Sequence, residues 1–93
     1  MYKIEIKSSF RRDTKKLSFD LEVAISSVLK SLRDNPFNPN LKIKKLRGKK
    51  NIFRAKISSH RLVFRIEKKN IELLHFAARD KIYTKKHFDL FML

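Results

Sequence analysis

Residues 42–65, KIKKLRGKKNIFRAKISSHRLVFR, determine the fold that we predict, because they combine a β-strand pattern with dense positive charge. Apolar and basic residues alternate in residues 53–57 and again in residues 61–66. Successive side chains of a strand point to opposite faces of a sheet, so each run predicts a strand with one apolar face. Ser58 and Ser59, between the two runs, favour a short hairpin loop.

This hairpin places four cations on one face of the predicted sheet, namely Arg54, Lys56, Arg61 and Arg65. Like charges held close together repel one another, which costs stability unless an anion lies among them. Two interpretations remain open: a solvated polar face and an anion-binding site. The repetition of the pattern on two neighbouring strands favours the anion site.

The N-terminal part of the chain predicts one strand and two helices. Residues 2–7 alternate and form the first strand, with Tyr2 and the two isoleucines inward. Ser8 and Ser9 are candidate N-caps of a short helix, and Ser18 is the candidate N-cap of a longer helix over residues 19–33. The longer helix has a single apolar stripe, which consists of Leu21, Ile25, Val28, Leu29 and Leu32.

The C-terminal part predicts three or four strands and a tail. Two prolines in residues 35–40 end the long helix, Ile43 and Leu46 begin a second strand, and Gly48 lies in a turn. Residues 68–70 form a turn into residues 71–78, which are apolar on both faces and indicate a central strand. We therefore expect an α+β fold: an N-terminal strand, a helical hairpin, a mainly antiparallel sheet with helices on one face, and a short C-terminal helix or tail. The basic residues lie on the opposite, open face.

Composition limits the classes of function. A chain of 93 residues is expected to form a single domain over residues 1–93. It has no cysteine, so thiol nucleophiles and thiolate metal sites are excluded. We find no signal peptide and no apolar run long enough for a membrane span, and expect a cytoplasmic protein without a membrane partner. With 24 Lys and Arg, 9 Asp and Glu, and a net charge of +15, the chain requires a polyanionic partner, either nucleic acid or an acidic protein.

The three histidines do not form a predicted metal site, because they are scattered and lack a carboxylate cluster. We expect neither a metal nor another cofactor. His75 lies in the apolar strand and is interpreted as a hydrogen-bonded core histidine.

At this point the chain resembles the RelE/ParE superfamily of bacterial and archaeal type II toxins, and more closely its RelE ribonuclease branch. The resemblance covers essentially the whole chain, in order and with matching spacings. The residues that carry it are Asn35 and Pro36 after the long helix, residues 45–48 (KLRG), residues 53–57 (FRAKI), residues 59–66 (SHRLVFRI), Ala78 with Arg79, and Tyr83.

The resemblance implies a toxin that enters the A site of the 30S ribosomal subunit, cuts the mRNA there and inhibits translation. It also implies an acidic, RelB-like antitoxin that neutralises the toxin in a hetero-oligomer. The family chemistry is a metal-free endoribonuclease reaction, in which the ribose 2′-OH attacks the adjacent phosphate and expels the 5′-oxygen. Such a reaction needs a base, positive charge on the phosphorane oxygens and an acid for the leaving group.

The resemblance also assigns roles to individual residues. Lys56 stands at the position of a catalytic lysine and is the candidate base. A lysine can accept a proton only as the neutral amine, which neighbouring cations favour. Arg54 replaces a second lysine of some members and can only stabilise charge, because arginine does not easily lose its proton. Arg61 matches the phosphate-clamping arginine, and Arg79 matches the proposed proton donor or transition-state stabiliser.

Other positions keep alternatives open. Tyr83 lies near the family's base-stacking tyrosine, with Phe88 as its substitute, and His60 and His87 are alternatives to Lys56 as the base. Arg65 either contacts a phosphate or forms an ion pair with Glu67 or Glu72. The residues expected to bind RNA or phosphate are Lys45, Arg47, Lys49, Lys50 and Arg65.

Two other functions compete with the nuclease. One is a ParE-like toxin that binds and inhibits DNA gyrase without catalysis, since the two branches share a fold and fold does not determine function. The other is a plain nucleic-acid binder or an inert remnant that retains the basic face. Lys56, Arg61 and Arg79, together with an aromatic residue in the tail, favour the nuclease.

Overall fold

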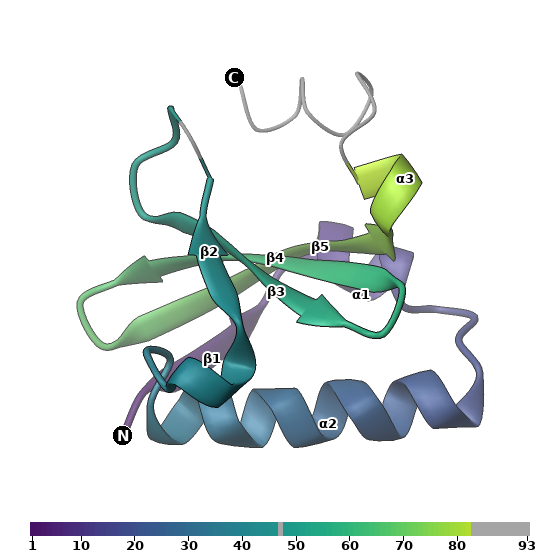
Figure 1. The fold of residues 1–93 in the computed structure, drawn as a ribbon, viewed down its shortest axis with the longest axis horizontal. Coiled ribbons are helices and arrows are strands. Elements are labelled where there is room, and N and C mark those ends of the chain that lie inside the picture. Colours follow the sequence, from purple (N-terminus) through teal and green to yellow (C-terminus); the bar gives the residue numbers. More distant parts are fainter. Residues whose placement is uncertain (47, 83–93) are drawn as a thin grey trace.

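Five strands form one sheet in the computed structural model of the chain, which describes residues 1–46 and 48–82 (Figure 1). The spatial order is β1-β5-β4-β3-β2, with β1 parallel to β5 and all other neighbours antiparallel. The strands are β1 (Lys3–Ile6), β2 (Ile43–Lys45), β3 (Ile52–Ile57), β4 (His60–Glu67) and β5 (Asn70–Ala78). The predicted α+β fold with a mainly antiparallel sheet is thus confirmed.

The long helix α2 (Phe19–Asp34) packs under one face of this sheet (Figure 1). It ends one residue beyond the predicted helix, and all five residues of its apolar stripe belong to the main core cluster. Ser18 is its N-cap, as predicted: the Ser18 Oγ accepts a hydrogen bond from the backbone N of Leu21 at 3.3 Å. The helix ends at Asn35, before Pro36, and a 3₁₀ turn η1 (Pro39–Leu41) follows. None of the helices in the described part of the chain has the length and apolar character of a bilayer-spanning helix.

The short helix α1 (Ser8–Asp13) differs from the prediction for its N-terminus. It begins at Ser8 after Lys7, and no side chain caps it, so Ser8 and Ser9 are not N-caps. The Ser9 hydroxyl instead donates a hydrogen bond of 2.6 Å to the carbonyl of Leu74 in β5. The sequence could not reveal this partner, because Leu74 is distant along the chain.

The helix α1 flanks β5 beyond the point where its pairing with β1 ends. Asp13 Oδ2 accepts a hydrogen bond from the backbone N of Phe76 at 3.1 Å and lies 2.9 Å from Nδ1 of His75. An uncovered strand edge presents unpaired backbone groups, and these side chains satisfy them. His75 is 6% exposed, which confirms the predicted hydrogen-bonded core histidine.

The face of the sheet opposite α2 carries a second, smaller apolar cluster. Its buried members are Ile52, Val63 and Ile82, with Leu46, Leu74 and Ala77 packed against them. Ile82 belongs to the short helix α3 (Arg79–Ile82), which therefore covers part of this face. The predicted open face is thus only partly open, and its apolar residues lie among its cations, since Ile52 pairs with Arg65 and Val63 pairs with Arg54.

Candidate anion-binding site

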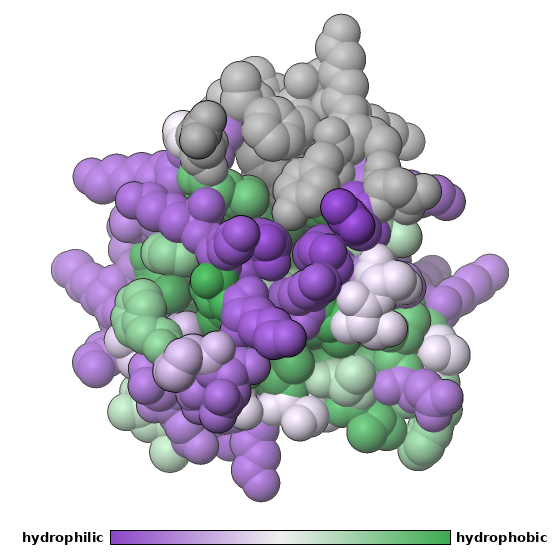
Figure 2. All heavy atoms as spheres, viewed as in Figure 1, coloured by the Kyte–Doolittle hydropathy of each residue, from purple (hydrophilic) through white to green (hydrophobic). Residues whose placement is uncertain are grey.

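Four predicted cations lie on the sheet face opposite α2, which we call the cation face and define by Arg54, Lys56, Arg61 and Arg65. The turn at Ser58 and Ser59 contains two residues, and Ser58 adopts a φ of +55°. This turn sets a register in which Lys56 pairs directly with Arg61. Side chains of directly opposed residues share a face and have Cβ atoms about 5 Å apart. In a space-filling view, hydrophilic side chains gather in a band across the middle of the molecule (Figure 2).

Arg61 is the most unusual of these cations, because it is only 5% exposed. Its Nη1 donates a hydrogen bond of 2.9 Å to the carbonyl of His60. Among the side chains that the structure describes, which exclude those of Arg47, Asp80 and residues 83–93, no carboxylate lies within 4.0 Å of its guanidinium. A buried charge without a counter-ion is costly. This arrangement suits a site whose counter-ion is a ligand.

Arg79 lies at the same end of the sheet as Lys56 and Arg61. Its backbone N donates a hydrogen bond of 2.8 Å to the carbonyl of Ser59 in the β3–β4 turn. The preceding residue, Ala78, pairs with His60 at the start of β4. The fold therefore brings Lys56, Arg61 and Arg79, three of the residues to which the resemblance assigns chemistry, to one end of the sheet, whereas Arg54 lies two residues farther along β3.

The other end of the cation face is neutralised within the protein. Glu72 lies opposite Arg65 and forms ion pairs with Arg65 at 3.1 Å and with Lys7 at 3.0 Å. Of the two alternatives for Arg65, the structure contains the ion pair, with Glu72 as the partner. Lys7 also pairs with Glu5 at 3.1 Å, so the charges of this end compensate one another.

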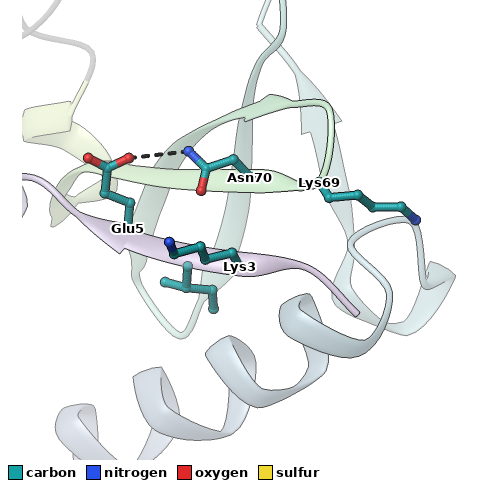
Figure 3. A pocket seen from close by; sticks show the side chains of 5 residues that line it. Lys3, Glu5, Lys69 and Asn70 are labelled. Atoms are coloured by element: carbon teal, nitrogen blue, oxygen red, sulfur yellow. Dashed lines mark hydrogen bonds between the residues drawn. The ribbon is translucent and has the colours of Figure 1, made fainter.

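Two pKa shifts follow from this network. The amide of Asn70, and then the ammonium of Lys7, hold the pKa of the Glu5 carboxyl below its ordinary value of 4.5. The carboxylates of Glu72 and Glu5 raise the pKa of Lys7 above 10.5. Figure 3 shows the hydrogen bond from Asn70 to Glu5, beside a surface hollow that Lys3 and Lys69 also line. An incoming anion therefore finds uncompensated positive charge at the Lys56 end, away from this network.

The edge strand β2 divides its two lysines between the two faces of the sheet. Lys45 pairs with Phe53 and so lies on the sheet face that carries the main core, whereas Lys44 pairs with Arg54 and lies on the cation face. Lys44 was not among the residues expected to bind RNA, although strict alternation from Ile43 would have identified it. The exposed Lys50 and half-buried Lys49 lie in the β2–β3 loop.

His60, the alternative base, lies apart from the other residues of the described site. The His60 ring stacks on Phe76, with centroids 5.1 Å apart, and His60 pairs with Ile57, so its ring lies on the α2 side of the sheet, away from Lys56. Within the described ranges, no group of three His, Cys, Asp or Glu side chains could hold a metal ion. The predictions for Arg47, Tyr83, His87 and Phe88 lie outside the described residues.

No family model matches the chain, and no curated protein matches it by sequence. Solved structures do. A chain of the RelB–RelE antitoxin–toxin complex from Methanococcus jannaschii superposes with a TM-score of 0.75 at 20% identity, over 85% of this chain and 94% of the other. This chain has the RelE-like toxin fold.

Two further structures show the same RelE-like fold. A copper-bound mutant toxin from Helicobacter pylori has a TM-score of 0.75 and 27% identity, over 89% of this chain and 100% of the other. YafQ from Escherichia coli has a TM-score of 0.72 and 16% identity, over 90% of this chain and 100% of the other. Each alignment covers most of both chains, so the similarity is not limited to the sheet.

Proposed function

We propose that this chain is the toxin of a type II toxin–antitoxin system and a ribosome-dependent endoribonuclease that cleaves mRNA in the A site. Solved structures of the same fold include the RelB–RelE antitoxin–toxin complex from Methanococcus jannaschii and the DinJ–YafQ complex from E. coli. The observation that supports a phosphate ligand is the guanidinium of Arg61, which is 5% exposed and has no carboxylate partner among the described residues. In this proposal the mRNA phosphate at the scissile bond supplies the missing negative charge.

The proposed reaction uses three side chains at one end of the cation face, Lys56, Arg61 and Arg79, together with Arg54 farther along β3. Lys56, as the base, takes the proton of the ribose 2′-OH, and the 2′-oxygen attacks the adjacent phosphorus. Arg61 and Arg54 stabilise the negative charge that develops on the phosphorane oxygens. The bond from phosphorus to the 5′-oxygen breaks, Arg79 stabilises or protonates that oxygen, and a cyclic phosphate remains.

The proposed protein partner is an acidic antitoxin that covers the cation face. A net charge of +15 favours such a partner, because complementary charge accelerates and orients association. In the purified complex, Lys44 and Lys56 should lose reactivity toward an amine-acylating reagent, whereas Lys68, in the turn at the opposite end of β4, should keep it. Equal reactivity of Lys56 in the free and bound protein would exclude this mode of neutralisation.

The test of catalysis is a cleavage map on ribosomes stalled on a defined mRNA. Purified protein is added, and new RNA ends are located by primer extension, with the same mRNA without ribosomes as a control. We expect cuts within the A-site codon only when ribosomes are present. Lys56→Ala and Arg79→Ala should abolish the cuts, whereas Lys68→Ala should retain them.

The gyrase-binding alternative gives the opposite result. A ParE-like toxin would produce no cuts, would inhibit supercoiling by gyrase, and would stay toxic with Lys56→Ala and Arg79→Ala. A folded wild-type protein that neither cuts mRNA on ribosomes nor inhibits gyrase would contradict both functions.

A further inference from the structure

An exposed aromatic ring lies outside the cation face, in the loop that follows α2. Phe37 is 61% exposed, although its backbone is fixed: the backbone N of Phe37 donates a hydrogen bond of 3.0 Å to Asn35 Oδ1. The ring contacts Phe53 edge to face, with centroids 6.4 Å apart, and Phe53 in turn stacks on buried Phe64 at 6.0 Å. The ring is therefore anchored to the core and still presents most of its surface to solvent.

This ring borders a small surface hollow of about 210 Å³ between the loop and β2. Two prolines, two aromatic rings and two lysines line it, namely Pro36, Pro39, Phe37, Phe53, Lys42 and Lys45. Both lysines are exposed, and neither has an ion-pair partner within the described ranges. The hollow thus combines a flat apolar surface with two uncompensated positive charges.

We propose that this hollow binds an unpaired nucleotide of an RNA strand, with the base stacked on Phe37 and the adjoining phosphates near Lys42 and Lys45. Sites for single-stranded nucleic acids combine these two components, because every base offers a flat face and every nucleotide a negative charge. An acidic peptide would satisfy the lysines, but it would need an apolar side chain at one particular position to cover Phe37, whereas every nucleotide carries a flat base beside its phosphate. RNA is therefore the ligand that uses the whole site.

The position of β2 connects this hollow to the cation face. β2 is the edge strand of the sheet, and its lysines point to both faces: Lys44 pairs with Arg54 on the cation face, whereas Lys45 lies on the side of the hollow. An RNA strand on the cation face can therefore continue around this edge and stay close to positively charged side chains along its path. The inference rests on the proposed function to the extent that both require RNA as the ligand.

The test compares two oligomers of equal length and charge, oligoadenylate and its abasic counterpart, by fluorescence anisotropy at a fixed salt concentration. Wild-type protein should bind oligoadenylate more tightly. Phe37→Ala should weaken the binding of oligoadenylate by roughly 5- to 150-fold and leave the abasic oligomer unaffected, since stacking of one base contributes about 1–3 kcal/mol. Phe37→Leu keeps an apolar contact with Phe53 and should show the same loss.

The matched control is Phe19→Ala, because Phe19 is a still more exposed phenylalanine, at 76%, and lines none of this hollow. It should bind both oligomers like the wild type. The double variant with Lys42→Gln and Lys45→Gln should weaken the binding of both oligomers equally. It should also make the slope of log K against log salt concentration shallower by about 0.7 for each lost phosphate contact. The chain contains no tryptophan, so Phe37→Trp also introduces a single tryptophan, whose fluorescence oligoadenylate should quench and the abasic oligomer should not.

The proposal would be overturned if wild-type protein bound the two oligomers with equal affinity. It would also be overturned if Phe37→Ala and Phe37→Leu changed the affinity for both oligomers by the same factor. A protein partner would then be the better occupant of the hollow. The result is independent of catalysis: a protein that fails to cut mRNA on ribosomes can still distinguish the two oligomers, and an active nuclease can fail to do so.

Discussion

Lys56 and Arg61 lie directly opposite each other across the β3–β4 hairpin, so that an exposed ammonium and a buried guanidinium share one face of the sheet. Their separation along the chain is short, and the two-residue turn fixes their register. Neither has a carboxylate partner within the described ranges. The pair therefore concentrates positive charge locally, and the effect of this charge on the free energy of unfolding can be measured.

Arg61→Met should stabilise the fold while abolishing any activity. Methionine has a similar length and removes a poorly compensated buried charge, so we expect the free energy of unfolding to rise by about 1–3 kcal/mol. Urea denaturation measures this value. The matched variant Arg65→Met should instead lose about 1 kcal/mol, because it deprives buried Glu72 of one ion-pair partner and leaves only Lys7. A loss of stability in both variants would mean that Arg61 is a structural residue.

Asp13→Ala should destabilise the protein by about 1–3 kcal/mol, because the backbone N of Phe76 and the imidazole of His75 lose their acceptor. Amide hydrogen exchange at Phe76 should accelerate in parallel. Asp34→Ala, at the exposed end of α2, serves as the control and should change stability by less than about 0.5 kcal/mol. Unchanged exchange at Phe76 in Asp13→Ala would contradict the role of α1 as a cover for the β5 edge.

Ser18→Ala should cost about 1 kcal/mol, since it removes the hydrogen bond between the side chain of Ser18 and the backbone of Leu21. Ser8→Ala should be nearly neutral, because Ser8 is exposed, lies inside α1 and caps nothing. Thermal or urea unfolding of the two variants under identical conditions checks the contrast. Equal losses would show that Ser18 does not act as a cap.

The carboxyl group of Glu5 should have a pKa below its ordinary value of 4.5, and Asn70→Ala and Lys7→Gln should each raise that pKa, because Asn70 donates a hydrogen bond to the carboxylate and Lys7 supplies both a hydrogen bond and a positive charge. The folded-state pKa lies below the unfolded value, so the stabilisation is present above about pH 4.5 and is lost as the pH falls through the folded pKa. For Lys7 the sign is opposite: its contribution is present below about pH 10.5 and is lost as the pH rises through the raised pKa. NMR titration of the Glu5 side chain measures the first shift, and an unchanged pKa in Asn70→Ala would refute its cause.

Local patterns predicted much of the fold. Alternation over residues 53–57 and 61–66 predicted the β3–β4 hairpin and the face of its four cations, and the apolar stripe with Ser18 predicted α2. These features depend on neighbours in the sequence. The periodicity of apolar residues and the chemistry of helix capping are therefore enough to predict them. The same alternation, applied from Ile43, would have placed Lys44 rather than Lys45 beside Arg54.

Contacts between distant segments could not be predicted in this way. No local rule pairs Asp13 with His75 or Ser9 with Leu74, because their proximity depends on where β1 ends along β5. The position of His60 on the α2 side, by contrast, follows from alternation, because His60 lies two residues before Leu62 of the main core; only its stacking on Phe76 requires another strand. The hollow beside Phe37 requires the loop after α2 to meet β2, which only the assembled sheet provides.

The parallel pairing of β1 with β5 has a consequence for the order of folding. Lys3 pairs with Asn70, so the first strand to be synthesised completes the sheet only after the last strand is available. Closing so long a loop costs entropy before the contact repays it, and such non-local pairing slows folding. During translation, β1 and the helices that follow it must wait without their sheet. The cation face does not have to wait in this way, because a two-residue turn joins its strands β3 and β4, and their pairing is local.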